Sequence, residues 1–302
     1  MNIISLFKQQ RGVLYAVSSG LCYGLLGYFG ISLMNSGLSI SNMLFWRFTI
    51  ATLFMCVILI PKYKTIFNSY KKNLLFIVYG IVFYTSSAMF YFMSSKHIGS
   101  GLAMVIFFTY PAIVMMFNVL FHKMVLRNTY YISFFIIIIG MICLANANKL
   151  TFNILGISLG ILAAFLYACY ILASKRTHIA PSISTLMVSL GSMISCLIAS
   201  YVYDTFNIPN GFNEWFNIVG MGTLCTAIPI LFFLQALKYI SSEQASMLSV
   251  FEPVAVLIFG VILLGEKISI IQIAGAIIIL SGAITTLLPS KIKNINNIQA
   301  LK

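Results

Sequence analysis

Long apolar runs separated by short polar segments make up almost the whole chain. A helix that crosses a membrane needs roughly 20 predominantly apolar residues. Ten runs approach or exceed this length, and the polar segments between them leave no room for a soluble domain. The pattern therefore predicts an all-α polytopic membrane protein with ten transmembrane helices, at 12–33, 42–60, 73–94, 98–121, 129–146, 153–174, 184–203, 215–237, 243–264 and 268–289.

The composition supports the same fold class. Hydrophobic residues make up 61% of the chain and charged residues only 8%, whereas a soluble domain carries about 25% charged residues. The bulk of the surface must therefore face a lipid bilayer. The net charge of +13 does not indicate a nucleic-acid partner, because the basic residues lie in short gaps between apolar runs and form no basic-aromatic patch.

The distribution of basic residues predicts the orientation of the helices. Cytoplasmic segments of membrane proteins carry an excess of Lys and Arg. With a cytoplasmic N-terminus, fourteen basic residues fall on the inner side and three, Lys96, Lys149 and Lys267, on the outer side. We therefore expect both termini in the cytoplasm, with residues 61–72 inside and 204–214 outside.

An internal repeat relates the two halves of the chain. A shift of 142 residues places Pro111 on Pro253 and gives eleven identities over positions 97–145. The repeat predicts two five-helix domains, at 1–147 and 148–290, followed by a polar cytoplasmic tail at 291–302. Because five is an odd number, the second copy must enter the membrane from the opposite side. Inverted repeats of this kind are common in secondary transporters, with the binding site between the halves.

Several segments are similar to one known family. The stretch "LKYISSEQASMLSVFEPVAVLIFGVILLGEKISIIQIAGAIIILSGA" at 237–283 closely resembles the last two spans of EamA-type members of the drug/metabolite transporter superfamily. The "FWRF" at 45–48 resembles the second-span arginine of that family, and residues 91–117 resemble the first-repeat counterpart. In the first repeat His122-Lys123-Met124 stands where many members carry Gly-Glu, so we expect Glu266 mainly to end a helix.

Glu252 is the only acidic side chain deep in a predicted span. An isolated charged side chain at the bilayer centre costs about 2.5–3.5 kcal/mol on insertion scales. Three interpretations remain open. A protonated Glu252 can hold two helices together, its carboxylate can bind an ammonium group of a cargo molecule, or it can carry a coupling proton.

Pro253 follows directly and cannot donate a backbone N–H group. We expect the carbonyl near Ser249 to lose its helical partner, and hence a kinked stretch that faces a wet cavity. Pro111 is the equivalent kink position, and the repeat register places Tyr110 opposite Glu252. Two interpretations of Tyr110 remain open: it clamps the cargo against Glu252, or it packs with its hydroxyl group on a backbone carbonyl.

Three further tyrosines, Tyr23, Tyr84 and Tyr167, lie at a similar depth in their spans, and Ser249 shares a helical face with Glu252. We expect these four residues to contact the cargo or to take part in proton coupling. Trp46 and Arg47 lie toward the outer end of the second span. For Arg47 we expect a side chain that reaches the interface water; binding of an anionic group is the alternative.

The resemblance implies a secondary carrier that works by alternating access in the bacterial cytoplasmic (inner) membrane. One deep carboxylate and several tyrosines favour a small amine-bearing or aromatic metabolite, such as an amino acid or a related compound, and the resemblance favours export. An uptake or exchange carrier for a nucleoside-related metabolite such as S-adenosylmethionine is the alternative. A lipid flippase or a non-transporting membrane sensor represents a different class. A proton is a candidate coupling ion, and the oligomeric state is left open.

An enzyme is not expected from this sequence. Intramembrane enzymes need clustered acids, a metal set or a nucleophile with its base. The three His residues fall in separate loops, and the six Cys residues are scattered singly through apolar runs. The sequence also contains no GxxxxGK[ST] phosphate-binding loop. We therefore expect no metal site, no disulfide and no cofactor.

Overall fold

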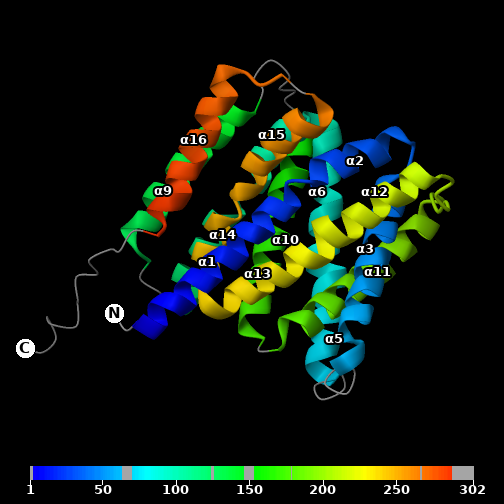
Figure 1. Cartoon of the computed structure of the whole chain (residues 1–302), viewed down its shortest axis with the longest axis horizontal. Helices are drawn as coiled ribbons and strands as arrows, with labels where there is room; N and C mark the ends of the chain where they lie inside the picture. The colour runs from blue at the N-terminus through cyan, green and yellow to red at the C-terminus, as the bar shows by residue number, and fades with distance from the viewer. Residues whose placement is uncertain are drawn as a thin grey trace, which may run out of the picture.

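The structure is a computed structural model that describes residues 3–62, 70–123, 126–145, 153–177, 179–265 and 267–287. Every regular element in these ranges is helical, and the helices pack into one bundle (Figure 1). The first half contains α1 (Ile3–Tyr23), α2 (Leu26–Asn35), α3 (Ile40–Leu59), η1 (Ile60–Lys62), α5 (Tyr70–Tyr79), η2 (Gly80–Thr85), α6 (Ser86–Ile98), α7 (Ser100–Phe107), α8 (Tyr110–His122) and α9 (Asn128–Leu144). The second half contains α10 (Ile154–Arg176), α11 (Pro181–Val202), α12 (Phe212–Gly222), η4 (Thr223–Ala227), α13 (Ile228–Tyr239), α14 (Ser242–Leu248), α15 (Phe251–Leu264) and α16 (Ile270–Thr285).

The predicted all-α fold with ten spans is confirmed. Within the described ranges, eight helical segments are long and apolar enough to cross a membrane, and the last segment of each half, α9 and α16, is a shorter apolar helix. The predicted tail at 291–302 and the predicted helix end at Glu266 lie outside the described residues.

The backbone repeats with the register read from the sequence. The shift of 142 residues carries Tyr70, Ser100 and Asn128, where α5, α7 and α9 begin, onto the residues where α12, α14 and α16 begin. The third segment of each half contains a π-helix, η2 in the first and η4 in the second. The fourth segment of each half is broken in the middle, between α7 and α8 and between α14 and α15. The irregular features are therefore part of the duplicated plan.

Helices of each half pack directly on helices of the other half. The first helix of each half lies on the third segment of the other, so that α1 packs on α13 and α10 packs on α6. The second helices α3 and α11 pack on each other, and each also contacts the π-helix of the opposite half. The last helices α9 and α16 lie side by side along one edge of the bundle (Figure 1). The interior of the bundle is thus built by both halves together.

The two predicted kink prolines each lie in the first turn of the helix that follows the break in a fourth segment. Pro111 follows the first residue of α8, and Pro253 is the third residue of α15. A missing N–H group costs little there, because the first turn of a helix has no intrahelical acceptor for it. The expectation that the Ser249 carbonyl loses its partner is wrong, because the Glu252 backbone N–H donates to it over 2.9 Å.

Candidate functional site

A pocket lies beside helix breaks of both halves, with the π-helix η2 in its wall. It lies between α1, α2, α3, η2, α6, α7, α10 and α15, so that both halves contribute walls. Its lining combines one acidic and one basic residue with aromatic and small side chains. The lining residues are Tyr23, Leu26, Arg47, Tyr84, Ser87, Ala88, Tyr91, Phe92, Phe107, Phe108, Tyr167 and Glu252.

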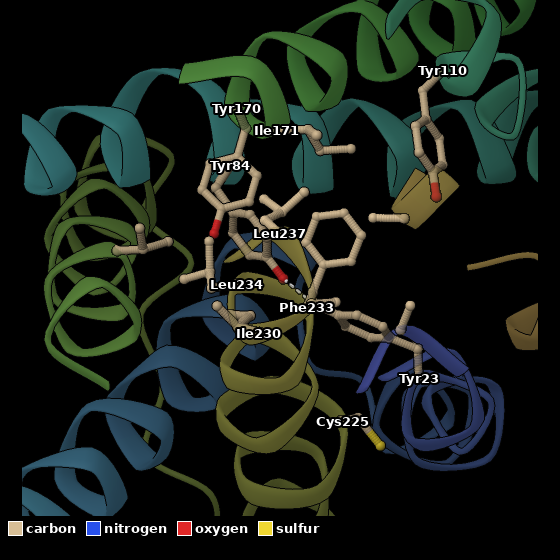
Figure 2. Packing of buried hydrophobic residues seen from close by; sticks show 14 of the residues in the cluster. Tyr23, Tyr84, Tyr110, Tyr170, Ile171, Cys225, Ile230, Phe233, Leu234 and Leu237 are labelled. Atoms are coloured by element: carbon tan, nitrogen blue, oxygen red, sulfur yellow. Dashed lines mark hydrogen bonds between the residues drawn. The ribbon is translucent and has the colours of Figure 1, made fainter. Parts of the chain in front are cut away.

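Aromatic rings make up much of the pocket wall and pack on one another behind it. The hydroxyl groups of Tyr23 and Tyr84 lie 2.9 Å apart, which joins α1 to η2. The Tyr84 ring meets the Tyr170 ring edge to face at 5.0 Å, and Tyr110 meets Tyr167 in the same way at 4.8 Å. Figure 2 shows Tyr23, Tyr84 and Tyr170 in this interior, with Phe233 of α13 beside them. These rings give the pocket wall an apolar surface that carries a few hydroxyl groups.

Glu252 is held at the break between α14 and α15. It is the second residue of α15, directly after the turn that ends α14, and its side chain is partly buried and lines the pocket. The helix α1 packs directly beside it, so close that a Cβ atom on Gly20 would lie 3.2 Å from the Glu252 backbone nitrogen. Among the described residues, the Glu252 carboxyl group has no hydrogen-bond or ion-pair partner. The carboxyl group is therefore available to a group inside the pocket.

Arg47 is not where the sequence pattern led us to expect it. The residue is only 3% exposed and lines the same pocket as Glu252. Its Nε donates to the Thr226 hydroxyl group over 2.6 Å, and its Nη2 donates to the Cys225 carbonyl over 3.1 Å. Neighbouring residues on a helix point about 100° apart. Trp46 can therefore lie at the bundle edge and donate to the Asn207 carbonyl, while Arg47 turns inward.

Two of the residues singled out in the sequence do not line the pocket. The Tyr110 hydroxyl group donates to the Ser246 carbonyl over 3.2 Å, and the residue is almost fully buried. The Ser249 hydroxyl group bonds back to the Ala245 carbonyl of its own helix over 3.1 Å. For Tyr110 this arrangement matches the packing interpretation. Tyr110 also packs on Phe107 and Tyr167, which line the pocket, and so supports the wall from behind.

The structure brings Tyr23, Tyr84, Tyr167 and Glu252 together in one pocket, as the sequence suggested. It adds Arg47 and the aromatic residues Tyr91, Phe92, Phe107 and Phe108. Phenylalanines in an apolar span carry no sequence signal that separates a cavity wall from a lipid-facing surface. Arg47 does carry one, because a basic residue inside a span is rare and commonly functional. Among the described residues, no cluster of His, Cys, Asp and Glu could hold a metal ion.

Comparison with known proteins decides the family. The EamA-like transporter family matches this chain twice in succession, at residues 10–146 and 154–288. The chain belongs to the EamA-like transporter family. It is therefore a membrane transporter and not an enzyme, and the two successive matches agree with the duplicated backbone.

Individual relatives support the assignment of this EamA-like transporter. The chain is 24% identical over 291 residues to the Uncharacterized transporter YxxF of Bacillus subtilis (strain 168), covering 94% of this chain and 92% of the relative. It is 27% identical over 139 residues to an Uncharacterized transporter of Archaeoglobus fulgidus, covering 45% of this chain and 48% of the relative. A solved crystal structure has the same fold, with a TM-score of 0.79 at 17% identity, over 91% of this chain and 96% of that chain.

Proposed function

We propose that this EamA-like transporter is a secondary carrier for a small amine-bearing metabolite with an apolar or aromatic part. The observation that supports this most is a lone carboxyl group, that of Glu252, in a pocket whose other walls are mostly aromatic. Aromatic faces and a carboxylate both attract an ammonium group, and the attraction grows when the group leaves water. Tyr23, Tyr84 and Tyr167 supply hydroxyl groups and ring faces for the rest of the cargo.

The position of the pocket fits alternating access. Along α10, Tyr167 lines the pocket, Tyr170 lies one turn further on, and Ser174 lines a second cavity beyond it. Lys175 and Lys238 border that second cavity, which opens at the end predicted to be cytoplasmic. Tyr170 and Phe233, which are 1% and 2% exposed, pack against Tyr167 beside the first space. We infer that these two rings form the layer between the two spaces. We infer that a rocking motion of the two halves opens this layer and closes the opposite side.

The orientation belongs to the proposal as well. We propose that the protein lies in the cytoplasmic membrane with both termini in the cytoplasm and exports its cargo. Ile208 lies in the long loop after α11 and is exposed, so a cysteine there tests the orientation in a variant without native cysteines. We expect an impermeant maleimide to label Ile208→Cys in intact cells. Labelling only after permeabilisation would reverse the orientation.

Counterflow in proteoliposomes tests the carrier mechanism itself. Vesicles preloaded with an unlabelled candidate should accumulate the same labelled compound from outside, with a saturable initial rate. Amino acids and their amides provide the first panel, and S-adenosylmethionine tests the nucleoside-related alternative. Movement of a fluorescent phospholipid between leaflets without counterflow of any panel compound would favour a flippase, and neither activity would favour a sensor.

A further inference from the structure

We propose that Arg47 binds a carboxylate group of the cargo and is the residue that restricts the pocket to zwitterionic compounds. The inference rests on the proposed function, because it concerns the same pocket and the same cargo. It goes further in assigning a second charged contact, opposite in sign to Glu252. A carrier with only Glu252 as a charged contact would accept simple amines equally well.

The first support is the hydrogen-bond inventory of Arg47. A guanidinium group has five N–H donors. Two of them are used, one by the Thr226 hydroxyl group and one by the Cys225 carbonyl, which leaves three without a partner among the described residues. The residue is 3% exposed and lines the pocket, so these donors are shielded from bulk water and face the space where a cargo lies. A carboxylate accepts two parallel N–H bonds from such a group.

The second support is the charge balance of the pocket. A buried cation needs an anion or several acceptors to offset the loss of hydration. Within the described residues neither Arg47 nor Glu252 forms an ion pair, although both line the same pocket. The two side chains therefore place an acidic group and a basic group at separate points of one small space. A molecule with an ammonium group and a carboxylate group can satisfy both at once.

The third support is the way in which the fold fixes the guanidinium group. A π-helix leaves backbone carbonyls outside the regular hydrogen-bond pattern, and short π-helices are frequent at functional sites. The Cys225 carbonyl and the Thr226 hydroxyl group that hold Arg47 both belong to the π-helix η4. The equivalent position in the other half is Ser189, whose buried hydroxyl group has no hydrogen-bond partner in the part of the chain that the structure describes. The pocket thus has one carboxylate-binding group, which orients the cargo in one direction only.

If Arg47 served only to join α3 to η4, it would form the same two hydrogen bonds. The test must therefore compare the binding of ligands with and without a carboxylate group. We use three pairs of probes, leucine and leucinamide, phenylalanine and phenylalaninamide, and tryptophan and tryptophanamide. Each amide keeps the ammonium group and the side chain but has no carboxylate. Titration calorimetry with the purified wild-type protein should give at least about tenfold tighter binding of the amino acid in each pair that binds.

Variants assign this preference to Arg47. Arg47→Gln should bring the two dissociation constants of a pair within about threefold, through weaker binding of the amino acid rather than tighter binding of the amide. Arg47→Lys should retain part of the preference, because an ammonium group keeps the charge without the two parallel donors. Ser189→Ala is the matched control in the second half and should leave the ratio unchanged.

The possible results test the role of Arg47 separately from the proposed carrier function. Equal affinity of the wild-type protein for both members of a pair, or an unchanged ratio in Arg47→Gln, would overturn the role of Arg47 while the proposed carrier stands. No binding of any member of any pair would contradict the amine-bearing cargo and Arg47 with it. If Arg47→Gln does not fold, the wild-type ratio and Arg47→Lys still give the answer.

Discussion

The two halves of this transporter share a backbone and differ in chemistry. With the shift of 142 residues, Tyr110 of the first half corresponds to Glu252 of the second, and Arg47 of the first half corresponds to Ser189 of the second. The breaks in the fourth segments and the π-helices in the third segments fall at equivalent positions in both halves. Duplication therefore accounts for the shape of the interior, and a few unmatched side chains account for its charge.

The π-helices illustrate the same division. Tyr84 in η2 corresponds to Thr226 in η4. The phenol of Tyr84 lines the pocket, whereas the hydroxyl group of Thr226 accepts a hydrogen bond from Arg47. One copy of the motif supplies a wall and the other positions a charged side chain. An asymmetric pocket can thus form between two halves whose backbones repeat.

The largest expected effect separates Glu252 from its counterpart Tyr110. Glu252→Gln should lower the initial uptake rate of the counterflow cargo at least about tenfold, because the amide keeps hydrogen bonding but has no negative charge. Tyr110→Phe loses one hydrogen bond to the Ser246 carbonyl and should lower the rate less than about fivefold. Both rates are measured in proteoliposomes at equal amounts of folded protein.

The same pair of variants distinguishes the interpretations of Glu252. Counterflow needs no net movement of a coupling ion, whereas uptake against a gradient does. Glu252→Gln that keeps counterflow but loses uptake driven by an imposed pH gradient would assign the coupling proton to Glu252. If Glu252→Gln has the rates of the wild-type protein in both assays, Glu252 has a packing role only. If Tyr110→Phe is as defective as Glu252→Gln, the two positions do not differ in function between the halves.

The first helices give the second comparison. The first half has a break after Gly24, between α1 and α2, whereas α10 of the second half runs without a break. A Cβ atom on Gly24 would lie 2.2 Å from the Cβ atom of Ala255, so the two helices touch through this glycine. Gly24→Ala should therefore destabilise the fold by about 1–3 kcal/mol, a typical cost of overpacking. An apparent Tm in detergent micelles measures the change.

Gly27→Ala is the matched control on the same segment. Its new Cβ atom would lie 3.5 Å from the Val256 side chain, an ordinary contact, so its Tm should stay close to that of the wild-type protein. Equal losses in Gly24→Ala and Gly27→Ala would show that the close approach to Ala255 is not what fixes α1 on α15.

Much of the fold could be predicted from the sequence, because span length and repeat register depend on local patterns. Apolar runs reveal helices, and Pro111 and Pro253 mark the segments that break. The break between α1 and α2 has no such mark, since Gly24 is one of several glycines in its span. Gly24 meets Ala255 at this break, and Ala255 is far away in the sequence, so the contact is seen only in the fold.

The candidate site could be predicted only in part, for a related reason. A carboxylate in an apolar run stands out, so Glu252 could be found. Whether a side chain near it faces the pocket or supports the wall depends on rotation about a helix that is apolar all round. The pattern could therefore not separate Tyr84, which lines the pocket, from Tyr110, which bonds behind it. For Arg47 the pattern gave the depth but not the direction of the side chain.

The smallest expected effect compares the ends of the fourth segments. Lys123 after α8 and Gly265 after α15 occupy equivalent positions, and both adopt the left-handed conformation, with φ of 50° and 65°. This conformation costs a residue with a Cβ atom roughly 1 kcal/mol or more. Gly265→Ala should therefore lower the stability by about 1 kcal/mol, and Lys123→Gly should raise it by a similar or smaller amount, because glycine also loses more backbone freedom on folding. Opposite shifts of the apparent Tm would establish that the two helix ends obey the same backbone requirement with different residues, whereas a loss of stability in Lys123→Gly would indicate that the lysine side chain has a contact of its own.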